Sequence, residues 1–254
     1  MYPVRAKKHL GQHFLKDDNI AKKIVASLQE NKNVLEIGPG TGILTNHLLQ
    51  IQHINLKVIE IDKESVEYLL SQFPVLKEKI ISADFLSYDL KGLFDGSYSI
   101  IGNFPYNIST QILFRVLENR NQINEVVGMF QKEVAVRIAS GPGNKDYGIL
   151  SVLLQAYYQI NYLFTVNETV FVPPPKVKSA VIRLLRNDVK KLDCDEKLFF
   201  SIVKTAFNQR RKMLRNALSS FKFKEESTIN TLMTKRAERL NVQEFVYLTA
   251  NVLG

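Results

Sequence analysis

Apolar and polar positions along the first 140 residues follow two alternating patterns. Short apolar runs of strand length occur in five segments, and apolar residues recur between them at the spacing of one helix face. Strands that alternate with helices in this way are typical of βαβ units. Such units build a mostly parallel sheet with helices on both faces. The five predicted strands cover residues 34–37, 56–62, 79–84, 98–103 and 125–130.

The pattern changes after Gly141-Pro142-Gly143. A helix is predicted over residues 148–160, because its apolar residues keep helical spacing. Two strands are predicted over residues 162–172 and 179–186, on either side of a proline run. We expect them to form an antiparallel pair that closes the sheet.

The chain after the last predicted strand differs from the α/β part. Residues 187–196 are polar and lack periodicity, which is typical of a linker, whereas residues 197–253 have helical spacing throughout. The fold class expected is a Rossmann-like α/β sheet with helices on both faces, plus a small all-helical domain. The domain boundaries expected are 1–187 for the α/β domain and 188–254 for the helical domain.

Composition excludes several classes of protein. The content of 45% hydrophobic and 23% charged residues is ordinary for a globular protein. No apolar run reaches the roughly 18 residues of a membrane span, and the basic N-terminus lacks the apolar segment of a secretory signal. Cys194 is the only cysteine, and the four histidines lack metal-ligand spacing. We therefore expect a cytoplasmic protein with no metal and no membrane contact.

The net charge of +9 is concentrated in two zones that flank a nearly neutral body. The first zone is the N-terminal segment, residues 1–16, which includes Lys7, Lys8 and Lys16 and contains no acid. The second is the helical domain. This distribution is typical of a polyanion binder, although solubility alone would also explain it.

One segment of the helical domain combines cations with a buried face. "KTAFNQRRKMLRNAL" (204–218) contains no acid, and its apolar residues recur at helical spacing. We expect one helix here that docks a polyanion, with Met213 among the residues that face the core. Its cations would meet phosphates; the alternative is a solvated surface. The cations predicted to bind the polyanion in the two zones are Lys7, Lys8, Lys204, Arg210, Arg211, Lys212 and Arg215.

A glycine turn follows the first predicted strand. "GPGTG" (38–42) opens a helix, and glycine there lets the backbone approach a ligand closely. Its spacing is one residue shorter than the dinucleotide fingerprint G-x-G-x-x-G. Pro39 also lacks the N–H that a pyrophosphate cradle would use. The turn therefore argues against NAD and favours a ligand without phosphates, with Gly38 and Gly40 among its contacts.

Carboxylates end the next two predicted strands. Glu60 could take both hydroxyls of a ribose, and Asp84 could accept from an adenine amino group. Open α/β sheets bind ligands at these carboxyl ends. Taken singly, each acid could be a helix cap or a solvated loop residue. Together with the glycine turn they predict S-adenosylmethionine, which has a ribose and an adenine but no phosphate.

The sequence Asn103-Phe104-Pro105-Tyr106 follows the fourth predicted strand. If the methyl acceptor is an adenine amino group, the Asn103 oxygen and the Phe104 carbonyl can accept its two hydrogens. Those bonds would localise the nitrogen lone pair. Pro105 disfavours helix at Phe104 and so aims its carbonyl, and Tyr106 offers a ring on which a flipped base can stack. We expect Tyr106 and Phe104 to grip the base; the alternative is a hydrophobic turn.

Asn-x-Pro-Tyr after a fourth strand resembles the amino-group methyltransferases of nucleic acids. The chain further resembles the bacterial small-subunit rRNA adenine dimethyltransferases, the kasugamycin-sensitivity enzymes, from about residue 5 to residue 250. The segments that carry this resemblance are "KKHLGQHFL", "EIGPGTG", "NFPYNIST", "FQKEVAVRI", "GNKDYGILSV", "FVPPPKVKSAVIRL" and "AFNQRRKMLRN".

The resemblance implies a substrate and a set of cofactor contacts. The substrate would be two adjacent adenines in a hairpin near the 3′ end of 16S rRNA, each dimethylated by a monomeric enzyme on the small ribosomal subunit or its precursor. His13 departs from the Asn usual in the family, and neutral His can supply the same hydrogen bond. Phe104 replaces the commoner Leu. The implied cofactor contacts are His13, Leu15, Gly38, Glu60, Asp84 and Asn103.

Other functions stay open at this point. The large-subunit rRNA adenine methyltransferases of macrolide resistance share the expected fold and chemistry, although "GQHFL", "PPPKV" and "NQRRK" favour the small-subunit enzyme. A DNA adenine methyltransferase would need a separate base-reading domain. The protein could also act mainly as a ribosome assembly factor whose methylation is secondary.

Overall fold

The computed structural model describes residues 4–29 and 32–253 of the 254-residue chain. These residues divide into two compact units. The first lies within Met1–Ala135 and Asn161–Arg186, and the second within Val136–Ile160 and Asn187–Gly254. The expected domain boundary after residue 187 lies one residue beyond the point where the chain passes from the first unit to the second, between Arg186 and Asn187. Residues 136–160 differ from the expectation, because they pack with the helical unit.

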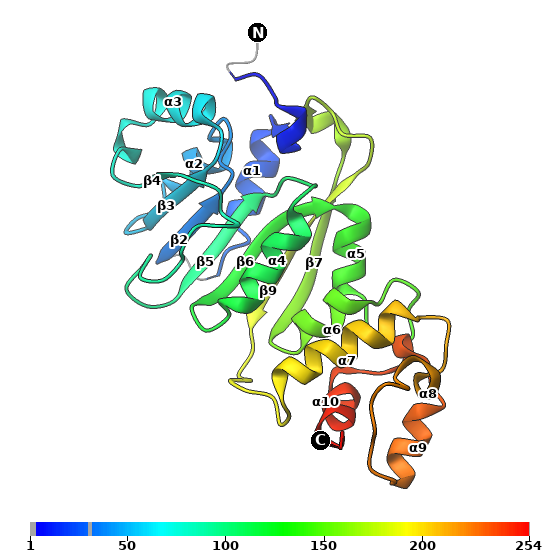
Figure 1. The fold of residues 1–254 in the computed structure, drawn as a ribbon. Coiled ribbons are helices and arrows are strands. Elements are labelled where there is room, and N and C mark those ends of the chain that lie inside the picture. Colours follow the sequence, from blue (N-terminus) through cyan, green and yellow to red (C-terminus); the bar gives the residue numbers. More distant parts are fainter. Residues whose placement is uncertain (1–3, 30–31, 254) are drawn as a thin grey trace. The chain divides into compact units, whose positions relative to one another are not determined.

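A seven-stranded mixed sheet is the centre of the fold (Figure 1). Four neighbouring pairs are parallel, β4–β3, β3–β2, β2–β5 and β5–β6, whereas β6 and β9 are antiparallel. The expected α/β class is therefore confirmed. The strands in spatial order are β4 (Ile80–Ser82), β3 (Asn55–Glu60), β2 (Asn33–Ile37), β5 (Tyr98–Asn103), β6 (Ile123–Gln131), β9 (Ser179–Arg186) and β7 (Tyr158–Val166).

The strand order reverses between β2 and β5. The chain passes from β2 to β3 and β4 on one side, and the next strands, β5 and β6, lie on the other side. The loops after β2 and β5 therefore diverge at the carboxyl edge of the sheet. A crevice at such a switch point is where open α/β sheets bind ligands.

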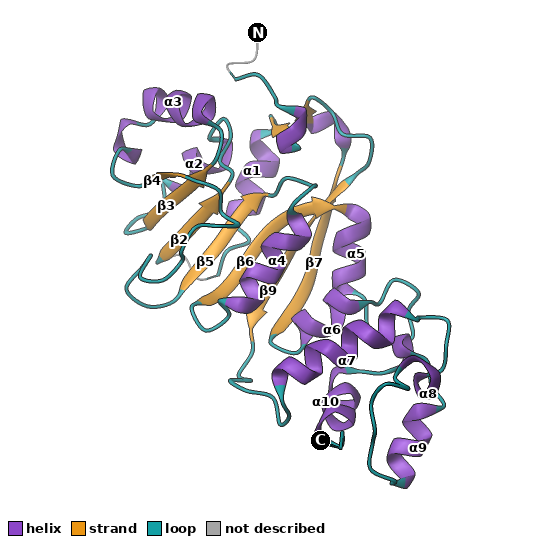
Figure 2. Ribbon diagram, in the orientation of Figure 1, coloured by secondary structure: helices purple, strands orange, loops and turns teal. Residues whose placement is uncertain are grey.

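Helices cover both faces of the sheet. Ala21, Ile24 and Leu48 pack with alternate strand residues such as Val58 and Val127 in one hydrophobic core. Figure 2 shows α4 in front of the sheet, and its buried residues include Ile112 and Leu113. The helical elements before β7 are η1 (Lys8–Leu10), α1 (Asp18–Val25), α2 (Ile43–Leu48), α3 (Lys63–Gln72), η2 (Pro74–Leu76), α4 (Ser109–Glu118), α5 (Lys132–Ala139) and α6 (Ile149–Gln155).

The strands near the proline run differ from the expected pair. β7 begins at Tyr158, inside the predicted helix 148–160, and ends at Val166. After η3 (Glu168–Val170), β8 (Phe171–Val172) leaves the main sheet and pairs antiparallel with β1 (Phe14–Leu15). A continuous strand over 162–172 was therefore wrong, because the chain turns at Asn167 to reach the N-terminal arm.

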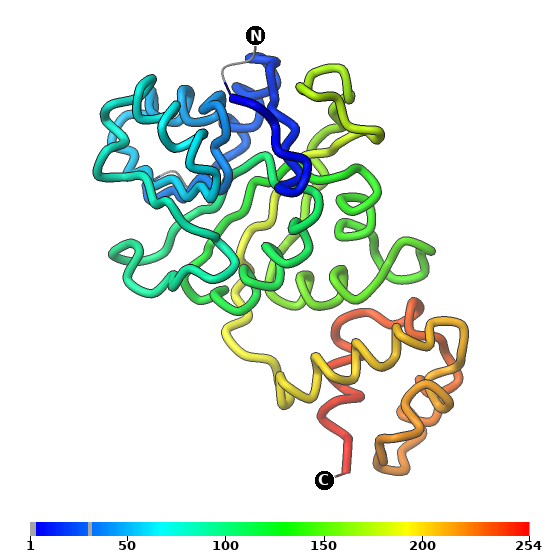
Figure 3. The backbone as a smooth tube through the Cα atoms, turned by 45° about the horizontal axis from the view of Figure 1, so that its top comes forward, coloured from blue at the N-terminus to red at the C-terminus, as the bar shows by residue number. Residues whose placement is uncertain are grey.

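The second unit is helical after Asn187. Buried residues of α6, α7 and α10 form its core, in which Phe207 lies between Tyr147 and Phe245, with a ring centroid 6.0 Å from each. The backbone tube of Figure 3 follows these helices from yellow to red. Its helical elements after β9 are α7 (Glu196–Asn208), α8 (Leu214–Ala217), α9 (Ser227–Met233), η4 (Ala237–Arg239) and α10 (Val242–Ala250).

The predicted single helix over 204–218 is wrong. α7 ends at Asn208, residues 209–213 form a turn, and α8 begins at Leu214. Met213 has extended backbone angles and pairs with Arg236 in an isolated β-bridge, so its side chain is 40% exposed and does not face the core. Local periodicity could not reveal this bridge, because its partner is distant in the sequence.

Candidate active site

A pocket lies at the carboxyl edge of the sheet, within the first unit. Its walls come from the ends of β2, β3, β4 and β5 and from residues 10–15, which belong to the segment 7–15 that we call the N-terminal arm. The structure thus brings together residues that sequence reasoning had placed on separate strand ends. The predicted cofactor residues that line this pocket are His13, Leu15, Gly38, Gly40, Glu60, Asp84 and Asn103.

The glycine turn packs closely against the N-terminal arm and also lines the pocket. Gly40 has a φ of 57°, which side chains of L-residues rarely adopt, and a Cβ there would lie 2.9 Å from the Phe14 ring. Its N–H donates to Oε2 of Glu60 at 3.1 Å. The turn therefore directs this N–H to a carboxylate and leaves the pocket without the phosphate cradle of a dinucleotide site.

Glu60 is held rigidly at the end of β3. The residue is buried, and its Oε1 accepts from the Asp62 N–H at 2.9 Å. Burial raises the pKa of the Glu60 carboxyl, and the bonds from Asp62 and Gly40 offset part of that rise. A carboxylate has about four acceptor positions, so it can accept from two hydroxyls besides these two N–H groups.

Asp84 lies just beyond β4, where its Oδ1 accepts from the Leu86 N–H at 2.9 Å. The residue is half-buried and lines the pocket. This bond fixes the carboxylate while Oδ2 can still accept from a ligand. The position suits the adenine end of a nucleoside bound beside Glu60.

Glu36 is a pocket residue that sequence reasoning missed. It is only 1% exposed, and its Oε2 accepts from the Thr45 hydroxyl at 2.7 Å. The pKa of Glu36 is raised to about 8, mainly by burial; the hydrogen bond from Thr45 opposes this rise, and the nearby Glu60 carboxyl contributes to it. A charged residue inside the apolar strand sequence "NVLEI" was the available signal.

Asn103 and His13 are joined at the acceptor end of the pocket. The Nδ2 of Asn103 donates to the His13 carbonyl at 2.8 Å, which leaves Oδ1 as the amide's acceptor atom. The His13 imidazole is itself fixed, because its Nδ1 lies 2.8 Å from the Pro173 carbonyl and must donate to it. In the neutral ring Nε2 is then the acceptor.

The two aromatic residues of the site have different environments. The Tyr106 ring is 5.4 Å from the His13 ring, and its hydroxyl lies 2.5 Å from Oγ of the buried Ser179. Burial raises the Tyr106 pKa, and the Ser179 bond opposes that rise. Phe104 is only 1% exposed and meets Phe130 edge-on, so its ring cannot grip a base as expected. Its backbone role stays a prediction.

The backbone of this loop continues the sheet before it turns. The Phe104 N–H donates to the Met129 carbonyl at 3.2 Å, and Ile108 donates to the Pro105 carbonyl at 3.2 Å. The ring of Pro105 fixes the bend between these two bonds. The loop after β5 is therefore anchored on both sides of the predicted catalytic residues Asn103, Phe104, Pro105 and Tyr106.

The predicted RNA-binding cations separate into two groups. Lys7 is paired with Asp62 and Glu64, and Arg210 donates to the Lys145 carbonyl, so both differ from the expectation of free phosphate contacts. Carboxylates and carbonyls within each unit satisfy these two side chains. The predicted cations that are exposed are Lys8, Lys204, Arg211, Lys212 and Arg215.

Among residues 4–29 and 32–253, no cluster of three His, Cys, Asp or Glu side chains has the arrangement of a metal site. No helix there is long and apolar enough to cross a membrane.

The pocket suits an S-adenosyl nucleoside. Glu60 can take its ribose, Asp84 its adenine, and the turn at Gly38 leaves room for the chain that carries sulfur. Glu36 and Glu60 are buried beside the pocket, and a cationic ligand would favour their ionised forms over the protonated forms that burial favours. Asn103 borders the same pocket, so an acceptor amine bound at this edge could meet the methyl group.

Comparison with solved structures supports the fold. A dimethyladenosine transferase from Plasmodium falciparum superposes with a TM-score of 0.78, at 22% identity, covering 93% of this chain and 96% of its own. The 23S rRNA methyltransferase ErmE gives a TM-score of 0.71, at 23% identity, covering 93% and 99%. At such identities the likeness concerns the fold alone.

Sequence comparison is more specific. The family model described as ribosomal RNA adenine dimethylase matches residues 4–251. Ribosomal RNA small subunit methyltransferase A of Cytophaga hutchinsonii is 58% identical over 257 residues, which cover 100% of both chains. The protein of that name from Flavobacterium johnsoniae is 56% identical, covering 99% of this chain and 97% of its own. The chain therefore belongs to the ribosomal RNA adenine dimethylase family and is an S-adenosylmethionine-dependent methyltransferase.

Proposed function

We propose that the protein dimethylates the N6 amino groups of two adjacent adenines in a hairpin near the 3′ end of 16S rRNA. The observation that carries the proposal is the Asn103 amide, which is oriented by the His13 carbonyl at the edge of the pocket that Glu60 and Asp84 also line. The relatives named small subunit methyltransferase A, at 58% and 56% identity, support the choice of the small subunit.

The cofactor contacts are part of the proposal. S-adenosylmethionine, when bound, supplies an activated methyl group on a positively charged sulfur. Glu60 holds the ribose hydroxyls, Asp84 accepts from the adenine amino group, and the Gly38 turn lies beside the methionine portion. His13 and Leu15 close the pocket from the N-terminal arm.

Asn103 and Phe104 prepare the acceptor nitrogen. Its lone pair is delocalised into the adenine ring, which makes the amino group a weak nucleophile. Oδ1 of Asn103 and the carbonyl of Phe104 accept its two hydrogens and draw the nitrogen toward tetrahedral geometry. The methyl then forms a bond to nitrogen while its bond to sulfur breaks, and one proton leaves to solvent. Alignment of the reacting atoms at about 3 Å supplies much of the rate.

Tyr106 holds the extruded adenine. The ring lies beside the His13 imidazole, and the Ser179 contact fixes its orientation. Stacking of a base on such a ring is worth about 1–3 kcal/mol. A base that can leave its RNA stack could therefore be retained long enough for two transfers.

The RNA partner is the small ribosomal subunit or its precursor, on which the enzyme acts as a monomer in the cytoplasm. The exposed cations Arg211, Lys212 and Arg215 would contact phosphates, with Lys8 on the arm. Such contacts position the RNA without reading its sequence. Base selection then rests with the Asn103 pocket.

Mass spectrometry of rRNA nucleosides tests this function. Small subunits from cells that lack the enzyme are incubated with protein and isotope-labelled S-adenosylmethionine, and a 3′ fragment of 16S rRNA is then digested. We expect N6,N6-dimethyladenosine in that fragment, formed at least about 10²-fold more slowly with Asn103→Ala. Label that appears only in 23S rRNA would overturn the proposal in favour of the large-subunit reaction.

A further inference from the structure

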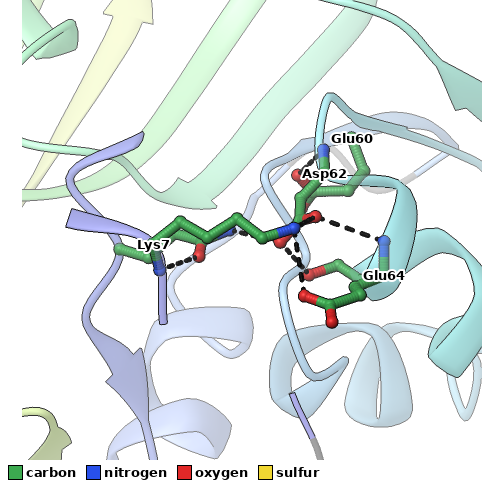
Figure 4. Close-up of polar contacts among 6 residues, drawn as sticks. Lys7, Glu60, Asp62 and Glu64 are labelled. Atoms are coloured by element: carbon green, nitrogen blue, oxygen red, sulfur yellow. Dashed lines mark hydrogen bonds and ion pairs between the residues drawn. The ribbon is translucent and has the colours of Figure 1, made fainter. Parts of the chain in front are cut away.

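Lys7 reaches from the N-terminal arm to the start of α3. Figure 4 shows its ammonium pointing toward two carboxylates, those of Asp62 and Glu64. It contacts Oδ1 of Asp62 and lies 3.0 Å from Oε2 of Glu64. The arm is therefore joined by charge to the element that follows the ribose-side strand β3.

Gln12 makes a second connection between the same two segments. Its Oε1 accepts from the Lys7 backbone N–H at 2.8 Å, and its Nε2 donates to Oδ2 of Asp62 at 3.1 Å. Each carboxylate oxygen of Asp62 thus receives a donor from the arm. Two connections at different points of the arm fix its direction as well as its distance from α3.

Asp62 is a rigid anchor. It is 3% exposed and caps α3, with Oδ1 accepting from the Glu64 N–H at 3.2 Å and Oδ2 from the Ser65 hydroxyl at 3.3 Å. Its own N–H donates to Glu60. The residue that receives the arm therefore also orients the carboxylate at the ribose side of the pocket.

The far end of the arm is fixed at the acceptor side. The His13 carbonyl receives Nδ2 of Asn103, and the His9 carbonyl receives Nδ2 of Asn107 at 3.3 Å. Gly11 allows this approach, because its φ is 65° and a Cβ there would lie 2.5 Å from Oδ1 of Asn107. The arm therefore connects the ribose side of the pocket to the loop that carries Asn103.

We infer that Asp62 is a positioning residue that holds the N-terminal arm across the cofactor pocket and so couples cofactor binding to the placement of Asn103. The contacts of Lys7 and Gln12 with Asp62, and of Lys7 with Glu64, are called the latch. This inference rests on the proposed function for the role of Asn103. The part that concerns Asp62 and Glu60 depends only on binding of the cofactor.

The charges of the latch persist at neutral pH. Burial raises the pKa of Asp62, but the bonds from Lys7 and Gln12 outweigh it and lower that pKa below its ordinary value. The bonds to Asp62 and Glu64 raise the pKa of Lys7. An ion pair with one buried partner resists screening by salt better than an exposed pair.

Calorimetry of S-adenosylmethionine binding, without RNA, tests the latch. We expect Lys7→Met to weaken cofactor affinity about 3- to 10-fold and Asp62→Asn to do the same, since Asn still caps α3. Lys7→Arg should restore most of the affinity. The matched control is Lys63→Met, which removes the same charge from the exposed lysine next to Asp62 and should leave the cofactor affinity unchanged.

A double-mutant cycle separates a shared contact from two unrelated effects. Lys7→Met combined with Asp62→Asn should weaken cofactor binding by less than the sum of the two single effects, because both substitutions remove the Lys7–Asp62 contact. In the methylation assay the single variants should also lower kcat, since Asn103 loses its support. A melting temperature within a few degrees of wild type would exclude unfolding as the cause.

Two results would overturn the inference. One is a Lys7→Met protein with wild-type cofactor affinity whose rRNA binding becomes less salt-dependent, which would make Lys7 a phosphate contact. The other is full additivity in the cycle. Failure of the proposed function would instead appear as absence of dimethyladenosine with the calorimetric effects intact, so the two failures are distinguishable.

Discussion

The backbone carbonyl of His13 accepts a hydrogen bond from Nδ2 of Asn103 at 2.8 Å. The two residues are 90 positions apart in the sequence. An amide side chain can rotate by half a turn at little cost unless its surroundings distinguish N from O. The carbonyl does so here, because it can only accept. The Oδ1 atom of Asn103 is therefore oriented without any ligand, as the proposed contact with an amino group requires.

Asn103→Ala should lower turnover by about 10²-fold or more, on the order of 3 kcal/mol, because a preorganised polar group is lost from the reaction site. Affinity for small subunits should barely change. Single-turnover methylation and filter binding measure the two quantities. Asn121→Ala, at an exposed position outside the pocket, is the matched control. Turnover within about threefold of wild type would make Asn103 structural.

Two variants of Tyr106 can distinguish the role of its ring from that of its hydroxyl. Tyr106→Phe keeps the ring but loses the contact with Ser179, so we expect a loss of only a few-fold. Tyr106→Ala should lose about tenfold more, because base stacking is worth about 1–3 kcal/mol. Ser179→Ala should resemble Tyr106→Phe. Steady-state assays on small subunits give the comparison, and equal activity of the Phe and Ala variants would remove stacking from the mechanism.

Glu60→Ala should weaken S-adenosylmethionine binding by about 1–3 kcal/mol, because charge-assisted hydrogen bonds to the ribose are lost. It also leaves the N–H groups of Gly40 and Asp62 without their acceptor. Glu60→Gln keeps one carbonyl oxygen and should lose less. Isothermal calorimetry measures both variants, with the exposed Glu67→Gln as control. Unchanged affinity in Glu60→Ala would contradict the ribose assignment.

Strand ends were the most predictable part of this fold. Glu60 and Asn103 each close a short apolar run, and β3 and β5 end at those residues. Asp84 follows β4 by two residues. Such local patterns also predict that these strands run parallel, because helices connect them. The strand-end residues of the candidate pocket could therefore be predicted from local sequence alone, whereas the hydrogen bond from Asn103 to the His13 carbonyl could not.

Apart from Glu36, which had a local signal in the apolar strand sequence, the features that the sequence did not reveal depend on contacts between distant segments. The sequence indicates a solvent-exposed Lys7, whereas the fold places Asp62 beside it. The sequence predicts Met213 within a helix, whereas its bridge to Arg236 interrupts that helix. The sequence predicts that the Phe104 ring can contact a base, whereas Phe130 packs against that ring. Residue type and spacing carry no information on such partners.

Stability of the cofactor-free protein should depend on the ionisation of Glu36. Its pKa is raised from 4.5 in an unperturbed chain to about 8 by burial. Between those values the native state binds more protons than the unfolded chain, so the free energy of unfolding falls as pH rises, by at most about 1.4 kcal/mol per pH unit. Glu36→Gln removes this contribution and should flatten the dependence. Urea unfolding from pH 5 to pH 8 measures both proteins, and identical slopes would refute the assignment.

Arg211 and Lys212 are the cations of the 209–213 turn whose side chains are exposed, whereas Arg210 is half-buried and held by the Lys145 carbonyl. Neutralising a phosphate contact reduces the salt slope of binding by about 0.7–0.9 per contact, because fewer counterions are released. Arg211→Ala with Lys212→Ala should therefore reduce the slope for small subunits by about 1.4–1.8. Affinity for S-adenosylmethionine should stay unchanged.

Two comparisons make this measurement specific. Lys77→Ala with Lys91→Ala removes the same charge from exposed positions that precede β4 and β5, at the edge of the sheet opposite the pocket, and should leave the slope unchanged. Arg210→Ala should lower the melting temperature more than it changes the slope, because its guanidinium bonds within its own unit. Affinity is measured at several salt concentrations. A double variant at Arg211 and Lys212 with the wild-type slope would show that this turn does not touch RNA.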